Sequence, residues 1–92
     1  MRITLIDDEE KVRKNMRAML EKHVPEAEVI GEASGVNAGL AELERQVPEV
    51  LFLDVEMQDG LGFDLLAQYG EPDFQVVFVT GHDQYAIKAF KY

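Results

Sequence analysis

The sequence predicts an α/β fold in which a parallel sheet carries helices on both faces. Three runs have the length of buried strands, at residues 3–6, 50–53 and 76–79, and all their residues are apolar except Thr4. Segments with the apolar period of amphipathic helices lie between these runs. Two of the runs also end in aspartate, and the carboxyl ends of parallel strands share one edge of a sheet, where ligands collect.

The first strand is expected over residues 2–6, and an amphipathic helix follows from Asp8 to about Lys22. Pro25 breaks this helix. A short, more polar strand over residues 27–32 then suits an edge of the sheet.

A second helix is expected to begin after Ser34, which is a suitable N-cap, and to end before Pro48. Four apolar residues of the two helices are assigned to the core: Met16, Met19, Leu40 and Leu43.

The second half of the chain repeats the order of strand and helix twice. A strand over residues 50–53 leads through the glycine-bearing loop 59–62 into a short third helix. A fourth strand over residues 76–79 is followed by Thr80 and by a last helix. Asp83 would cap this last helix, and its apolar residues are Tyr85, Ala86, Ala89 and Phe90. The predicted order is βαβαβαβα, in one domain over residues 1–92.

Composition excludes several classes of protein. The hydrophobic fraction of 47% argues against disorder, and a net charge of -9 makes the domain a poor ligand for nucleic acid. The chain has no cysteine, so it has no disulfide or thiolate site. Because a strand is predicted from residue 2, we expect no signal peptide, and no apolar run approaches the roughly 20 residues that span a bilayer. We expect a soluble, cytoplasmic domain with no membrane contact.

Carboxylates follow two strands that are expected to be neighbours. Asp7 and Asp8 come directly after the first strand, and Asp54 comes directly after the strand over residues 50–53. Like charges about 4 Å apart repel by roughly 4 kcal/mol at an effective dielectric constant of about 20. The sequence therefore predicts a divalent cation site at this edge of the sheet.

Three motifs in order resemble the receiver domain of two-component response regulators, the CheY-like family. They are Ile3-Thr4-Leu5-Ile6-Asp7-Asp8-Glu9, Leu53-Asp54-Val55-Glu56-Met57 with Gly62-Phe63-Asp64-Leu65-Leu66, and Val77-Phe78-Val79-Thr80-Gly81. Residues 80–90 are similar to the branch of this family that usually carries a LytTR-type DNA-binding output domain.

The resemblance implies a flavodoxin-like, doubly wound sheet in which a histidine kinase phosphorylates one aspartate. Asp54 would be the phosphoacceptor, and the Thr80 hydroxyl would donate a hydrogen bond to the phosphoryl group. Asp8, Asp54 and the backbone carbonyl of Glu56 would ligate Mg²⁺, while Asp7 would hold a metal-bound water. On this reading the domain is a phosphoacceptor that assists its own phosphotransfer and is not otherwise an enzyme.

Two departures from the family pattern shape further expectations. Gln58 replaces the usual proline after the methionine, which loosens the loop after Asp54. The chain ends before a fifth strand and helix, and before the lysine that contacts the phosphoryl group in the family. The expected sheet order is therefore 2-1-3-4, with residues 74–79 at an edge. We expect a homodimer through this edge or through exchange of the last helix.

Other interpretations of the same residues remain. The acids at residues 7–10 are also typical of a helix start, Asp54 of a turn, and Thr80 of a strand end. A haloacid-dehalogenase-like phosphatase also uses an aspartate nucleophile with Mg²⁺, but it needs Asp-x-Asp after its first strand. A flavodoxin-like protein-interaction module with a vestigial acidic pocket is the other alternative.

Overall fold

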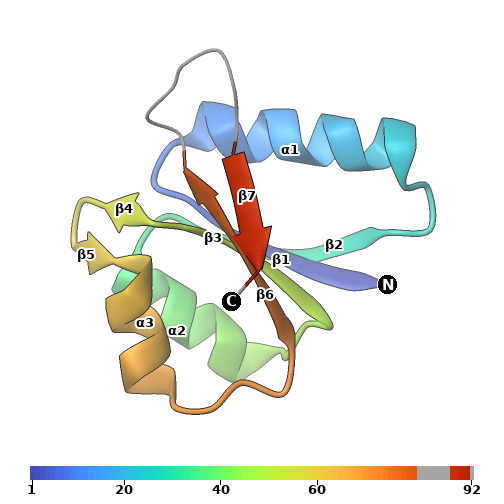
Figure 1. The fold of residues 1–92 in the computed structure, drawn as a ribbon. Coiled ribbons are helices and arrows are strands. Elements are labelled where there is room, and N and C mark those ends of the chain that lie inside the picture. Colours follow the sequence, from blue (N-terminus) through green and yellow to red (C-terminus); the bar gives the residue numbers. More distant parts are fainter. Residues whose placement is uncertain (81–87, 92) are drawn as a thin grey trace.

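The computed structural model describes residues 1–80 and 88–91. In that part of the chain a five-stranded sheet has the order β2-β1-β3-β6-β7, and β4 pairs with β5 in a separate hairpin (Figure 1). The strands are β1 (Arg2–Ile6), β2 (Glu28–Ala33), β3 (Val50–Asp54), β4 (Glu56–Met57), β5 (Gly60–Leu61), β6 (Gln75–Thr80) and β7 (Lys88–Lys91). The helices are α1 (Glu10–His23), α2 (Val36–Arg45) and α3 (Gly62–Tyr69).

The first four strands of the large sheet are parallel, which confirms the predicted order 2-1-3-4 and the edge position of β2. Helix α1 covers one face of the sheet, and α2 and α3 cover the other (Figure 1). Because successive strand residues point to opposite faces, each strand contributes to two cores. The face under α1 buries Ile3, Leu5, Val79 and Met16, and the face under α2 and α3 buries Ile6, Leu51, Leu53, Leu43, Leu65, Val76 and Phe78.

Helix α1 begins at Glu10, two residues later than predicted, and its inward face is narrower than expected. Met16 is buried, with Val12 and Leu20 packed beside it one turn away in each direction. Met19 was assigned to the core, but its side chain is 50% exposed. It lies about 60° around the helix axis from Met16, on the flank of the apolar strip.

Helix α2 does not use the predicted N-cap. Its N-cap residue is Gly35, which has no side chain to cap the helix, and Ser34 is exposed. The carboxylate of Asp59 instead accepts hydrogen bonds from the backbone of Val36 and Asn37. Within the helix, Leu43 is buried and Leu40 is packed against the core, as predicted.

The expected last helix is wrong where the structure describes it. Residues 88–91 form β7, which runs antiparallel to β6 from the pair Val77 and Lys91 to the pair Thr80 and Lys88. Residues 81–87, which include Asp83, Tyr85 and Ala86 of the predicted helix, lie outside the described residues. The apolar β6 carries a row of backbone groups on this side, and a returning strand satisfies them. The prediction that residues 74–79 form a free edge is therefore wrong from Val77 onward.

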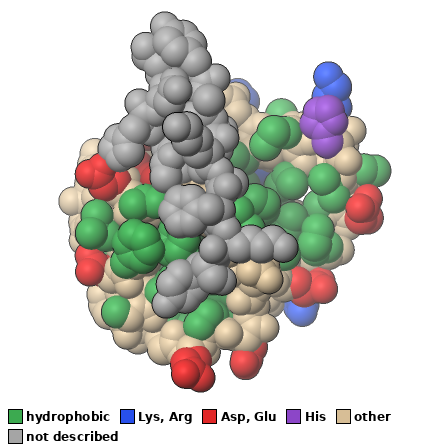
Figure 2. Space-filling model, viewed as in Figure 1, with side chains coloured by type: hydrophobic (Ala, Val, Ile, Leu, Met, Phe, Trp, Pro, Cys, Tyr) green, Lys and Arg blue, Asp and Glu red, His purple; other side chains and the backbone are tan. Residues whose placement is uncertain are grey.

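Several large apolar side chains stay at the surface of the described residues. The space-filling view shows apolar side chains on this face of the molecule, over α3 and beneath α1 (Figure 2). The exposed ones are Met1, Met19, Val47, Leu61 and Phe63. Among the described residues, none of the helices has the length and apolar character needed to cross a bilayer.

Candidate functional site

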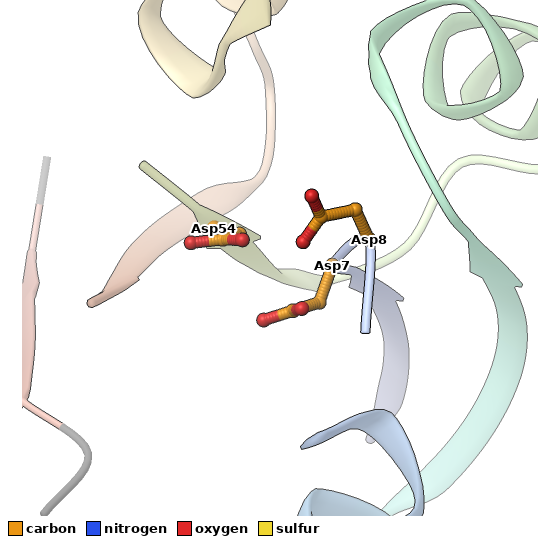
Figure 3. A group of neighbouring side chains, drawn as sticks. All are labelled: Asp7, Asp8 and Asp54. Carbon is orange, nitrogen blue, oxygen red and sulfur yellow. The ribbon is translucent and has the colours of Figure 1, made fainter. Parts of the chain in front are cut away.

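The acidic residues predicted from the sequence converge at the carboxyl ends of β1 and β3. These strands are hydrogen-bonded neighbours in parallel register, with Ile6 opposite Leu53. Asp7 and Asp8 therefore leave the sheet beside Asp54, and the three side chains meet in one space (Figure 3). One ligand atom from each of the three residues lies within 4.8 Å of the others.

Two of the three carboxylates are removed from water. Asp7 is 4% exposed and Asp54 is 8% exposed, while Asp8 is half-buried. Burial of this degree disfavours an isolated charge, and the neighbouring acids add repulsion. The site is therefore poorly suited to three bare carboxylates and well suited to a bound cation.

The pKa values of both buried groups, Asp7 and Asp54, are raised. Burial, followed by the charges of Asp7 and Asp8, raises the pKa of Asp54 from 3.8 to about 7, although a hydrogen bond from the Glu56 backbone opposes the rise. Burial also raises the pKa of Asp7, with the charges of Asp8 and Glu9 adding to it. The Glu9 backbone and the Arg13 guanidinium act in the opposite direction on the pKa of Asp7.

Asp7 is held by backbone groups on both sides. Its own N–H donates to the carbonyl of Ala33 at 3.1 Å, and its Oδ1 accepts from the N–H of Glu9 at 2.8 Å. The Arg13 guanidinium donates to the Asp7 carbonyl at 2.5 Å and to Glu32 at 3.1 Å. Sequence analysis did not identify Arg13, because its partner Glu32 lies on β2 and no local pattern joins them.

Glu56 lies at the start of the β4–β5 hairpin, two residues after Asp54. Its N–H donates to Asp54 Oδ1 at 3.3 Å, so its backbone is adjacent to the acidic group. The far side of the hairpin closes through the Gly62 N–H, which donates to the carbonyl of Val55 at 2.8 Å. A Cβ atom at residue 62 would lie 2.4 Å from the Asp54 carbonyl oxygen, so only glycine fits this close approach.

Thr80 lies at the same end of the sheet as the acidic residues. It is the last residue of β6, and Asp54 is in register with the preceding residue, Val79. The Thr80 hydroxyl lies outside the described part of the structure.

The loop that carries the departure from the family pattern is ordered as a tight hairpin. Gln58 and Asp59 form its two-residue turn, between the register pairs Glu56 with Leu61 and Met57 with Gly60. Asp59 also accepts two hydrogen bonds from the backbone of α2, and the loosening effect of Gln58 stays a prediction. Sequence analysis assigned no role to Asp59, because an aspartate before glycine reads as an ordinary turn residue.

This arrangement can bind a hard cation and present one carboxylate to an electrophile. Every donor in the group is an oxygen, which suits Mg²⁺ or a similar ion and not a soft metal. A carboxylate that binds the cation through one oxygen keeps its other oxygen free for nucleophilic attack.

Comparisons with known proteins agree with this geometry. The family model of the response regulator receiver domain matches residues 3–92. The chain is 36% identical over 94 residues to the sensory transduction protein LytT of Bacillus anthracis, covering 99% of this chain and 37% of LytT. It is 33% identical over 93 residues to the transcriptional regulatory protein BtsR of Escherichia coli K12, covering 99% of this chain and 38% of BtsR. The chain thus spans less than two-fifths of the length of these curated relatives.

Solved structures show the same fold. A two-component response regulator of the LuxR family from Aurantimonas matches with a TM-score of 0.79 and 23% identity, over 89% of this chain and 59% of that one. The response regulator TrrA from Thermotoga maritima, in complex with Mg²⁺ and BeF, matches with a TM-score of 0.76 and 21% identity, over 91% of this chain and 72% of that one.

Proposed function

Since this chain belongs to the response regulator receiver domain family, we propose that it accepts a phosphoryl group on Asp54 in a two-component signalling pathway. The observation that carries the proposal is the meeting of Asp7, Asp8 and Asp54 within 4.8 Å at the ends of β1 and β3. The donor would be a phosphohistidine of a partner kinase. One oxygen of Asp54 would attack phosphorus, the bond from phosphorus to the histidine nitrogen would break, and an acyl phosphate would form.

The residues present fit a Mg²⁺ ion, which would supply charge neutralisation for the transferring phosphoryl oxygens. Asp8, Asp54 and the Glu56 carbonyl would be its protein ligands, and Asp7 would hold a metal-bound water. The raised pKa values of Asp7 and Asp54 support this assignment, because the metal-free site resists full ionisation. The Thr80 hydroxyl would donate a hydrogen bond to a phosphoryl oxygen.

The signal would pass from the acyl phosphate to the end of β6. The modification adds a charge of about -1.5 to -2 and three acceptor oxygens beside Thr80. Attraction of the hydroxyl toward the phosphoryl group would then move Thr80 at the end of β6. In the longer relatives this change would reach an output domain, and a DNA-binding output domain and a cytoplasmic location are part of this proposal.

A homodimer is also part of the proposal, but by a changed route. Residues Val77–Thr80 already pair with β7 in one chain, so this edge is not open to a second copy without rearrangement. Exchange of β7 between two chains would make the same pairing across a dimer. Light scattering over a dilution series measures this, and a monomer at every concentration would contradict it.

Intact-mass measurement after incubation with acetyl phosphate tests the phosphoacceptor. The wild type and an Asp73→Asn control should gain one phosphoryl group when Mg²⁺ is present. Asp73 is exposed and precedes β6, at the opposite end of the strands, so it matches the charge change alone. The Asp54→Asn variant should gain none. Equal uptake by wild type and Asp54→Asn would overturn the assignment.

Binding of BeF with Mg²⁺ gives a second readout that needs no turnover, and this ligand pair is present in the complex of TrrA. Fluorine NMR should show a bound signal for the wild type and none for Asp54→Asn. A wild type that responds to neither Mg²⁺ nor BeF would favour the interaction module with a vestigial pocket.

A further inference from the structure

Asp59 joins two elements that are far apart in the sequence. It lies at the tip of the β4–β5 hairpin, and its carboxylate accepts the N–H of Val36 at 2.7 Å and the N–H of Asn37 at 3.1 Å. These N–H groups belong to the first turn of α2, where backbone donors have no partner inside the helix. Asp59 therefore supplies, from another part of the chain, the cap that Gly35 cannot supply.

The contact is built for a carboxylate at this place. The two backbone bonds hold the pKa of Asp59 below its usual range, as expected for an acid at the positive end of a helix. Gly35 is also matched to it, because a Cβ atom there would lie 2.7 Å from Asp59 Oδ1. The three atoms nearest to that Cβ position all belong to the Asp59 carboxylate.

The same short connection between β2 and α2 also contacts Asp7, a member of the acidic group. The carbonyl of Ala33, at the end of β2, accepts the N–H of Asp7 at 3.1 Å. Three residues later the N–H of Val36 binds Asp59. Residues 33–37 thus contact both the turn that carries Asp7 and Asp8 and the hairpin that begins at Glu56.

We infer that Asp59 is a positioning residue for the metal site, because its bonds to α2 brace the β4–β5 hairpin that carries the Glu56 carbonyl. The inference rests on the proposed function, in which that carbonyl is a metal ligand. A hairpin of two-residue strands is only marginally stable without outside contacts. Its base is tied to Asp54 through the Glu56 N–H, and Asp59 ties its tip.

A pair of variants separates bracing from helix stability. Asp59→Ala removes both bonds, so it should lower the melting temperature and weaken Mg²⁺ binding. Adding Gly35→Ser to that variant supplies α2 with a local N-cap, and removal of the Asp59 carboxylate leaves room for the new side chain. The double variant should recover the melting temperature while its Kd for Mg²⁺ stays roughly tenfold above wild type, the scale seen when outer contacts of a metal site are removed.

Two controls address charge and the hairpin itself. Asp59→Asn removes the charge but keeps an oxygen acceptor for Val36, so its Kd should lie closer to wild type than to Asp59→Ala. Hydrogen exchange without metal should show faster exchange for the amides of residues 56–61 in the double variant than in wild type.

The outcomes distinguish the two proposals. A wild-type Kd in the double variant, or unchanged exchange of residues 56–61, would overturn the bracing role and leave the metal site standing. An Asp59→Asn variant as weak as Asp59→Ala would replace bracing with a charge effect. A wild type that binds no Mg²⁺ in calorimetry, or an Asp8→Ala variant that binds it equally well, would overturn the metal site and this inference together.

Discussion

Replacing Asp54 with asparagine should stabilise the metal-free protein at alkaline pH. The change keeps the size of the side chain and an oxygen that can accept the Glu56 N–H, but it removes one of three crowded charges. The pKa of Asp54 is about 7 in the folded protein, whereas it is near 3.8 in the unfolded chain. Wild-type stability should therefore fall as pH rises from about 4 to about 7, because the unfolded state ionises first.

The size of the effect follows from the same two values. A difference of about 3 pH units corresponds to roughly 4 kcal/mol at 1.36 kcal/mol per unit. Asp8 is only half-buried, so solvent screens part of the repulsion, and we expect about 2 kcal/mol. For a domain of this size, that corresponds to a rise of about 10 °C in the melting temperature.

The melting temperatures of the wild type and Asp54→Asn are measured by thermal unfolding, followed by circular dichroism, at about pH 5 and about pH 8. In a chelator, Asp54→Asn should melt above wild type at the higher pH and close to it at the lower pH. Millimolar Mg²⁺ should raise the melting temperature of the wild type and leave that of the variant nearly unchanged, because a ligand that binds only the folded state stabilises it. Equal melting temperatures of the two proteins at about pH 8 in chelator would refute the electrostatic reasoning.

Four other substitutions test separate parts of the structure by thermal or urea unfolding. Asp8→Ala should melt above wild type in chelator and show a smaller response to Mg²⁺; an unchanged response would count against Asp8 as a ligand. Gly62→Ala should cost about 1–3 kcal/mol, since its Cβ would meet the Asp54 carbonyl oxygen at 2.4 Å. Leu43→Ala should cost about 2–5 kcal/mol, because this fully buried side chain would leave a cavity. Thr4→Val should stabilise by about 1 kcal/mol, because the buried Thr4 hydroxyl has no hydrogen-bond partner among the described residues; a loss of stability would reveal a partner for it.

The strands were predictable because the signals that specify them are local. The strand expected over residues 2–6 is β1, and the strand over 50–53 is β3 with one further residue. A strand with apolar residues on both faces has no polar face to place in water, so it is stable only inside a sheet covered on both sides. The convergence of Asp7, Asp8 and Asp54 followed from the same signals, because adjacent parallel strands end at one edge.

The helix surfaces and the last element were less predictable. Apolar spacing placed Met19 in the core, but spacing does not give the width of the covered strip, and Met19 is half-exposed. The period of residues 83–90 suggested a helix, yet Lys88–Lys91 pair with β6. Pairing with an open strand edge is a long-range gain that local propensity does not contain.

The sequence by itself determined the fold class, the strand cores and the three acids of the candidate site. Only the tertiary structure decided how that site is supported: by the Ala33 carbonyl, by Arg13 and by Asp59 as the cap of α2. The physical reason is the range of the interactions. The burial of the strands and the place of the three acids at their ends follow from neighbouring residues. The hydrogen bond that Val36 donates to Asp59 spans 23 positions, and it forms only when the hairpin and the helix are brought together.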